Sequence, residues 1–236
     1  APNTKNPWRL DHTPGGSSSG SAAALAANMI LFSIGTQTSG SVLRPASYTG
    51  LTALKPTFGQ ISKAGIIPAS WSIDCVGVFT KNVRDIIYVY NEIAGYDVQD
   101  RYTFPYKNKK LFLSTGNLKR TFNIGILDDS YFESTNEVTT AFLDSVKQLG
   151  KLGHTIQTCS MPSIFEEANR AHEIVVDTET ASLHESYFIE KRELFSPELR
   201  RDIETGRSYS AIQHLKAQEI RWKYKQEFKE VFKNID

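Results

Sequence analysis

Two short segments gather the hydroxyl and amide groups of this chain that are best suited to chemistry. Residues 13–24 read Thr-Pro-Gly-Gly-Ser-Ser-Ser-Gly-Ser-Ala-Ala-Ala, and residues 35–45 read Gly-Thr-Gln-Thr-Ser-Gly-Ser-Val-Leu-Arg-Pro. Glycines let a backbone approach a ligand closely, and free N–H groups at the start of a helix stabilise developing negative charge. Serine hydroxyls beside such groups are candidate nucleophiles once a base activates them.

The first segment is either a flexible linker or a tight turn that leads into a helix. A linker continues in polar, low-complexity sequence, whereas this segment runs directly into residues 21–30, which are rich in alanine and favour a helix. We therefore prefer the turn. The second segment follows an apolar run, Leu31–Ile34, which we interpret as a buried strand that ends at Gly35. Two turns that flank one helix–strand pair can fold back on each other and share a pocket.

The two segments resemble the signature of the amidase signature family. The stretches HTPGGSSSGSAAALAANM and GTQTSGSVLRPASYTGLTALKPTFGQIS follow that signature almost continuously, and the resemblance extends through residues 70–77 to a helix at Asn82. In motif the chain is most similar to malonamidase-like bacterial amidases. The serine spacing also fits the family, since Ser17 and Ser41 are 24 positions apart.

The resemblance implies a Ser–cis-Ser–Lys triad. Ser41 matches the nucleophile, which becomes acylated. Ser17, which the family enters through a cis peptide, matches the serine that relays a proton to a neutral lysine base. The main-chain N–H groups of Thr38, Ser39 and Gly40, with that of Ser41, match the oxyanion hole, although the family usually has glycine where this chain has Ser39.

Three further side chains match positions around the family's site. The resemblance implies that Ser19 and Thr36 orient the triad through hydrogen bonds, with simple turn capping as the alternative. Arg44 matches an arginine that lies near the substrate, where a guanidinium would clamp a carboxylate with two hydrogen bonds. A structural salt bridge is the alternative for Arg44.

The lysine base is the part of the triad that the sequence does not supply. In the family it lies on a strand several dozen residues before the first turn, whereas only sixteen residues precede Ser17 here. Lys5 lies in a polar segment typical of a surface loop, and we interpret Lys55 as structural. We therefore expect a partial copy that lacks the lysine-bearing region and is inactive or nearly so by itself.

Beyond these turns, the sequence predicts an α/β fold. Residues 122–127 and 154–159 read as strands, and an apolar stripe over 138–149 indicates a helix between them, so the three form a βαβ unit. Another helix is predicted from an N-cap at Asn82 to a stop at Gly95. The resemblance implies a mixed β-sheet flanked by helices, incomplete in this chain.

We expect residues 1–236 to form a single, partial amidase-signature domain. It would comprise a signature core over 13–95, a connecting loop over 96–121, and an α/β and helical part over 122–236 that is mostly helix after Pro162. The last helix mixes apolar residues with many charges. We expect it to face solvent, and a role in binding a partner stays open.

Composition narrows the classes of function. The 27 basic and 26 acidic residues give no reason to expect nucleic acid or an anionic membrane as a partner. Two cysteines without a CxxC pair favour a reduced, cytoplasmic protein. The five histidines lack metal-ligand spacing, so we expect no metal and no cofactor. The expected ligand is a small-molecule amide, and a homodimer stays open.

Three hypotheses for the function follow. The first is hydrolysis of a carboxylic amide C–N bond (EC class 3.5.1) through an acyl-enzyme on Ser41. The second is the glutaminase subunit of an aspartyl/glutamyl-tRNA amidotransferase, which would need partner subunits and tRNA, and which more often has aspartate where this chain has Gln37. The third is a non-catalytic protein derived from the amidase fold.

Overall fold

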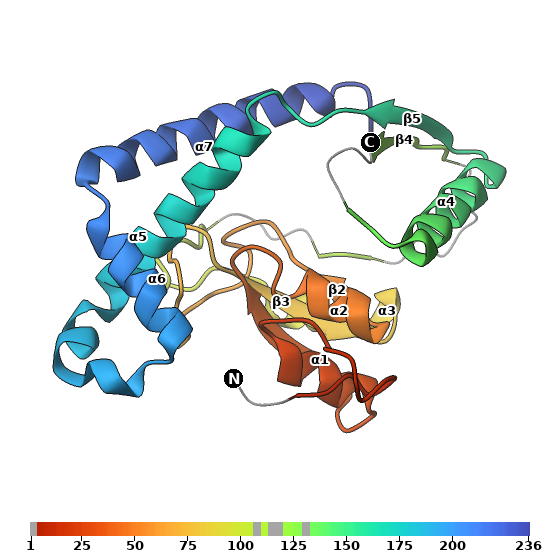
Figure 1. Ribbon diagram of the computed structural model, residues 1–236. Helices are drawn as coiled ribbons and strands as arrows, with labels where there is room; N and C mark the ends of the chain where they lie inside the picture. The colour runs from red at the N-terminus through yellow and green to blue at the C-terminus, as the bar shows by residue number, and fades with distance from the viewer. Residues whose placement is uncertain (1–3, 106–109, 113–119, 129–132) are drawn as a thin grey trace. The chain divides into compact units, whose positions relative to one another are not determined.

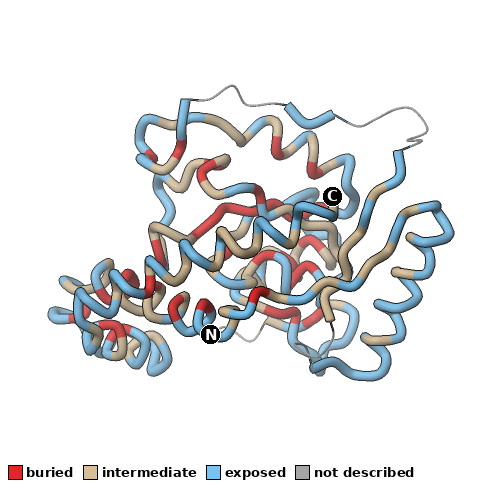
Figure 2. The backbone as a smooth tube through the Cα atoms, turned by 90° about the horizontal axis from the view of Figure 1, so that it is seen from above, coloured by how far each residue is buried: buried red, intermediate tan, exposed pale blue. Residues whose placement is uncertain are grey.

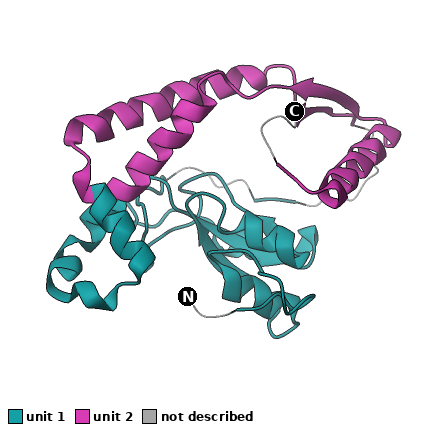
Figure 3. Ribbon diagram, in the orientation of Figure 1, with its two compact units in different colours: residues 1–115, 179–206 teal, residues 116–178, 207–236 magenta. Residues whose placement is uncertain are grey.

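The computed structural model describes residues 4–105, 110–112, 120–128 and 133–236, which form two compact units (Figure 3). Unit 1 comprises residues 1–115 and 179–206, and unit 2 comprises residues 116–178 and 207–236. Residues 106–109 and 113–119 of the predicted loop over 96–121 lie outside the described residues. The predicted division of the chain at residues 95 and 121 stays a prediction.

A three-stranded antiparallel sheet organises unit 1 (Figure 1). Its strands are β1 (Ser33–Gln37), β2 (Thr52–Leu54) and β3 (Cys75–Thr80), and β3 pairs with both of the others. Every residue of β3 is buried, as a central strand covered on both faces requires. Figure 2 shows the buried residues in red.

Helices cover both faces of this sheet. Because successive side chains of a strand point to opposite faces, Phe79 packs against α1 (Ser19–Ala26) and α2 (Leu43–Thr49), whereas Val78 packs against α3 (Val83–Ile93). The two core clusters are Ala22, Leu25, Val42, Ala46 and Phe79 on one face, and Ile61, Val76, Val78, Ile86 and Tyr90 on the other. Both serine-rich segments lead into the helices of the first face.

The strand after α1 begins later than the apolar run predicted. Leu31 and Ile34 are 89% and 43% exposed, so the prediction of a buried strand over residues 31–34 was wrong. The buried residues of β1 are instead the polar Ser33 and Gln37, whose side chains are hydrogen-bonded. Main-chain pairing with β3 and these side-chain hydrogen bonds, rather than apolarity, determine where the strand lies.

Helix α3 confirms the prediction made from its capping residue. The Asn82 side chain accepts a hydrogen bond from the N–H of Asp85 at 3.0 Å, as an N-cap residue does. The helix ends at Ile93, two residues before the predicted stop at Gly95. Its buried residues, Ile86 among them, cover the sheet.

Unit 1 also contains part of the helical region late in the sequence. This part consists of the second half of α5 (Phe165–Lys191), the short η2 (Arg192–Leu194) and most of α6 (Pro197–Ser208). Ala181, Phe188 and Ile203 form its apolar core. The hydroxyl of Thr180 donates to the carbonyl of Ala69 at 2.9 Å and so ties α5 to the segment before β3.

Unit 2 contains the predicted βαβ unit. Strands β4 (Asn123–Leu127) and β5 (Thr155–Cys159) pair in parallel, with α4 (Asn136–Lys151) between them in sequence. A long helix, α7 (Ala211–Val231), starts from a capping box at Ser210. The fold is therefore α/β with sheets flanked by helices, which confirms the predicted class.

The described part of the chain was searched for membrane-spanning helices and for groups of metal-binding side chains. No helix there is both long enough and apolar enough to cross a membrane. In the same residues, no three side chains of histidine, cysteine, aspartate or glutamate are grouped so that they would hold a metal ion.

Candidate active site

Gly15 shapes the first serine turn. Its φ of +76° lies in the left-handed region that favours glycine, and a Cβ atom built on it would lie 2.8 Å from the Cα atom of Pro45 in α2. Its N–H donates to the hydroxyl of Thr13 at 3.1 Å, and its carbonyl accepts from the hydroxyl of Ser19 at 2.7 Å. The first turn therefore packs directly against the helix that follows the second turn.

The two serine turns meet at Ser18 and Ser41. The N–H of Ser18 donates to the carbonyl of Ser41 at 3.2 Å, and the hydroxyl of Ser18 donates to the carbonyl of Thr36 at 3.3 Å. The peptide bond between Gly16 and Ser17 is cis, as the resemblance implied. Ser17 is exposed and Ser41 is half-buried. These contacts confirm that the two turns fold back on each other.

Two more serines fasten α1 to β1. The hydroxyl of Ser21 donates to the carbonyl of Ile34 at 2.9 Å, and the hydroxyl of Ser33 donates to the carbonyl of Ser21 at 3.0 Å. Ala22 and Leu25, on the apolar side of the same helix, are fully buried. Short polar side chains on one side and small apolar ones on the other thus hold the first turn on the sheet.

Gln37 and Asp74 hold the segment between β1 and α2. The side-chain oxygen of Gln37 accepts from the N–H groups of Val42 and Leu43, both at 2.9 Å. The hydroxyl of Thr38 donates to a carboxylate oxygen of Asp74 at 2.6 Å. The sequence interpretation missed both roles. A signal for Asp74 exists, because it is an acidic residue placed directly before an apolar strand.

The amides of Gly40 and Ser41 are available to a ligand. Within the described residues, their N–H groups have no hydrogen-bond acceptor, and only their carbonyls are used, by the N–H groups of Arg44 and Ser18. Consecutive free N–H groups beside a serine hydroxyl can receive the oxyanion that forms when such a serine attacks a carbonyl group.

The guanidinium of Arg44 lies over the same segment. A Cβ atom built on Gly40 would be 3.0 Å from Nη2 and 3.5 Å from Nε of Arg44. Arg44 is exposed and forms no ion pair with a carboxylate in the part of the chain that the structure describes. The alternative of a structural salt bridge therefore has no partner among those residues.

No described lysine is bound to either catalytic candidate. Lys5 is exposed in a segment without regular secondary structure, as predicted. Lys55 is also exposed, and its ammonium donates to the carbonyl of Pro56 at 2.7 Å. Over residues 4–105, 110–112, 120–128 and 133–236, no lysine is hydrogen-bonded to Ser17 or Ser41.

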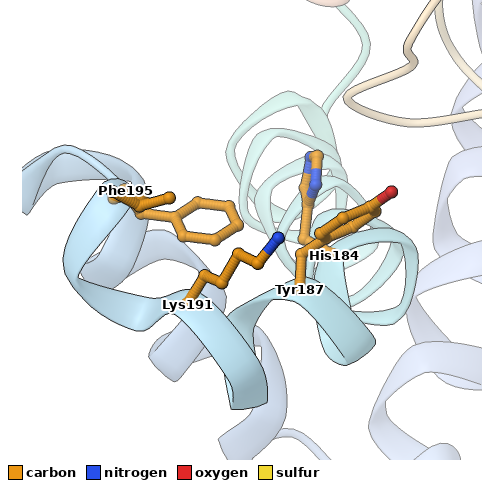
Figure 4. Close-up of a pocket in the computed structure, with 5 residues that line it drawn as sticks. His184, Tyr187, Lys191 and Phe195 are labelled. Carbon is orange, nitrogen blue, oxygen red and sulfur yellow. The ribbon is translucent and has the colours of Figure 1, made fainter.

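A separate cavity lies in unit 1 at the C-terminal end of α5 (Figure 4). It has a volume of about 220 Å³ and is lined by His184, Tyr187, Lys191, Leu194 and Phe195. The ring of His184 meets that of Phe195 edge-on at 5.7 Å, and burial lowers the pKa of His184. None of the residues of the serine turns lines this cavity.

The structure thus gathers the predicted residues in one place without testing their roles. Ser17, Ser41 and residues 38–40 lie in two turns that are hydrogen-bonded to each other. Ser19 bonds within its own turn, which is the turn-capping arrangement, and Thr36 takes part through its carbonyl. The catalytic, oxyanion and substrate-binding roles stay predictions.

Comparison with known proteins bears on the family. A family model described as Amidase matches residues 1–236. A glutamyl-tRNA(Gln) amidotransferase subunit of Listeria innocua is 35% identical over 99% of this chain and 53% of its own length. A solved amidase has a TM-score of 0.81 at 27% identity, over 99% of this chain and 52% of its own. The corresponding glutamyl-tRNA(Gln) amidotransferase subunit of Thermotoga maritima has a TM-score of 0.80 at 28% identity, over 98% of this chain and 51% of its own.

These matches run through the whole sequence, so they include both serine turns and the late helices. The chain spans about half the length of the curated relatives it matches. Sequence, fold and the paired serine turns agree, and the chain belongs to the amidase family.

Proposed function

We propose that the protein hydrolyses the C–N bond of a carboxylic amide through an acyl-enzyme on Ser41. The observation that carries this proposal is the meeting of the two serine turns, which places Ser41 against the turn of Ser17 and beside the free N–H groups of Gly40 and Ser41 itself. Membership of the amidase family supports the same reaction.

In this reaction the hydroxyl oxygen of Ser41 attacks the amide carbonyl carbon, and its proton passes to Ser17 and from there to a neutral lysine. The N–H groups of residues 38–41 stabilise the oxyanion, and each such donor contributes about 2.7–4 kcal/mol. The C–N bond then breaks, and the relay returns the proton to the leaving ammonia or amine. Water attacks the resulting ester and releases the carboxylic acid from Ser41.

None of the described lysines is hydrogen-bonded to Ser17 or Ser41, so the lysine of this scheme is proposed to be none of them. A nucleophile and its base act as a unit, so removing either one abolishes most of the rate gain. We therefore expect the 236-residue chain by itself to hydrolyse amides slowly or not at all. Hydrolysis by this chain that Ser41→Ala abolishes would contradict that expectation.

The proposed substrate is an amide that carries a carboxylate. This proposal is supported by the guanidinium of Arg44, which lies close to Gly40 and has no ion-pair partner among the described residues. Arg44→Lys in the full-length enzyme would lose a bidentate contact and should raise KM for such an amide by about tenfold or more. An amide without a carboxylate is the control, and its KM should stay within about twofold of the wild-type value.

A second candidate is the glutaminase subunit of a tRNA-dependent amidotransferase. The observation that favours it is the identity of the curated relative from Listeria innocua, a glutamyl-tRNA(Gln) amidotransferase subunit that is 35% identical. Glutamine is itself a carboxylate-bearing amide, so Ser41 and Arg44 would have the same roles. Ammonia release from glutamine only when partner subunits and tRNA are present would select this candidate over a free-standing amidase.

Covalent labelling tests the nucleophile. A fluorophosphonate probe should label the full-length wild-type protein and the variant Ser47→Ala, but not Ser41→Ala. Ser47 is a suitable control because it is an exposed serine in α2, six positions beyond Ser41. A probe that never modifies Ser41 in the full-length protein would instead favour a non-catalytic protein derived from the amidase fold.

A further inference from the structure

Two buried carboxylates in unit 1 have no part in the reaction described above. Asp74 and Glu179 are each 4% exposed. An ionised carboxylate only accepts hydrogen bonds, and its burial is costly unless several donors surround it. The donors to these two groups come from residues 69–72, a short segment before β3, and from Thr38 in the proposed oxyanion segment.

Asp74 connects that segment to Thr38. One of its carboxylate oxygens accepts from the hydroxyl of Thr38 at 2.6 Å. The other oxygen accepts from the N–H of Ala69 at 2.8 Å and from the N–H of Ser70 at 3.0 Å. Three donors on one buried carboxylate fix the orientation of the group and of the residues that supply the donors.

Glu179 holds the same segment from the side of α5. One of its carboxylate oxygens accepts from the hydroxyl of Ser70 at 2.5 Å and from the N–H of Ser72 at 3.1 Å. The next residue on the helix, Thr180, donates to the carbonyl of Ala69 at 2.9 Å. Residues 69–72 are therefore held between Asp74 on one side and α5 on the other.

A lysine accompanies the two carboxylates. The ammonium of Lys63 donates to the carbonyl of Trp71 at 2.6 Å and lies 4.3 Å from the centre of the Phe58 ring. Burial lowers the pKa of Lys63, and nearby negative charges, those of Asp74 and Glu179 among them, oppose that change. Residues 69–72 are thus hydrogen-bonded to two buried carboxylates, those of Asp74 and Glu179, and to the ammonium of Lys63.

We propose that Glu179 is a positioning residue for the oxyanion segment, acting through Ser70 and Asp74 on Thr38. The hydroxyl of Ser70 donates to Glu179 at 2.5 Å, and the N–H of Ser70 donates to Asp74 at 3.0 Å. The hydroxyl of Thr38 donates to the other carboxylate oxygen of Asp74 at 2.6 Å. Thr38 begins the segment whose following N–H groups would receive the oxyanion, so its orientation sets theirs. The inference rests on the proposed function of Ser41.

A positioning role differs from a purely structural one in what it changes. Oxyanion donors act mainly in the transition state, so misdirected donors lower kcat and leave KM nearly unchanged. A residue that only stabilises the fold lowers the unfolding temperature without that selective loss. The proposal therefore predicts a fall in kcat that is larger than the loss of folding stability can explain.

The main variant is Glu179→Gln in the full-length enzyme, assayed by amide hydrolysis and by the rate of fluorophosphonate labelling of Ser41. We expect kcat and the labelling rate to fall about tenfold or more, less than the loss of a whole oxyanion donor, with KM within about twofold. Thr180→Val is the matched control, because it removes a hydrogen bond from the same helix to the same segment. Its kcat should stay within about twofold of the wild-type value.

Two further variants keep the test decisive. Ser70→Ala breaks the same series of hydrogen bonds without placing an amide in the core, so it should also lower kcat. It takes the place of Glu179→Gln if circular dichroism shows that Glu179→Gln fails to fold. Thr38→Val breaks the far end of the chain, and the double variant Thr38→Val/Glu179→Gln should lose no more than the worse single variant. Multiplicative losses in the double variant would overturn the proposal.

The outcomes separate this inference from the function on which it rests. A wild-type protein that neither hydrolyses amides nor labels at Ser41 would refute the proposed function. A wild-type protein that labels normally, with unchanged kcat in Glu179→Gln or Ser70→Ala, would refute the positioning role alone. An equal loss in Thr180→Val would also refute it, because the effect would then belong to the helix and not to the carboxylate.

Discussion

Replacing Gly15 by alanine should destabilise unit 1 and separate the two serine turns. The left-handed φ of +76° costs a residue with a side chain about 1–2 kcal/mol. The new Cβ would also lie 2.8 Å from the backbone of Pro45, which cannot move as a side-chain end can, and overpacking of this kind costs about 1–3 kcal/mol. Together these give about 2–5 kcal/mol, a large share of the stability of a typical domain.

Two other glycines of unit 1 make it possible to measure the conformational cost separately from the cost of overpacking. Gly65 has φ +79° but open space around a built Cβ, so Gly65→Ala should cost only the conformational part, about 1–2 kcal/mol. Gly20 lies in α1, and apart from its chain neighbours and the backbone of its own helix no atom lies within 4 Å of a built Cβ, so Gly20→Ala should stabilise by about 0.5–1 kcal/mol.

Urea unfolding of the three variants, reported as free energies, provides the measurement. The predicted order of stability is Gly20→Ala, wild type, Gly65→Ala and Gly15→Ala, and only the last should also lose labelling of Ser41 in the full-length protein. A Gly15→Ala variant as stable as Gly65→Ala would refute the reasoning, because it would mean that the backbone contact with Pro45 imposes no constraint.

Two further predictions concern stability. Asn82→Ala should lower the free energy of unfolding by about 1 kcal/mol because the N-cap bond to Asp85 is lost, whereas Asn82→Gly should cost only a few tenths; equal losses in urea titrations would count against the cap. Burial, with the charge of Arg221, lowers the pKa of His172, so the unfolded state binds its proton more readily. The titration of His172 should therefore leave stability unchanged above about pH 6.5 and reduce it as the pH drops below that value. His172→Gln should reduce that fall between about pH 7.5 and pH 5.5, and an unchanged slope in urea titrations would contradict the assignment.

The parts of the fold that could be predicted from the sequence are those that depend on local sequence patterns. The cap at Asn82, the apolar stripe of α4 and the strand patterns of β4 and β5 each involve residues close together in the chain. The serine turns were likewise readable, because glycine and hydroxyl residues mark a turn wherever it lies. The meeting of the two turns followed from the short helix and strand that separate them.

The parts that could not be predicted depend on distant partners. The bond from Thr38 to Asp74 joins residues 36 positions apart, and that from Ser70 to Glu179 joins residues 109 positions apart. Glu179 lies in a long charged helix in which the sequence gives no sign that one carboxylate is buried. Helix α2 was missed because its seven residues include Pro45 and form no apolar stripe.

The side chain of Gln37 turns the segment after β1 into a closed ring. Its oxygen spans from the end of the strand to the N–H groups of Val42 and Leu43, with four residues between. An insertion or deletion in that ring would break the closure or shift the serine, whereas a substitution such as that at Ser39 would leave the ring intact. The number of residues between Gln37 and Val42 is therefore constrained more strongly than their identities. A library of single-residue insertions and deletions over residues 38–41, compared with substitutions there, would test this.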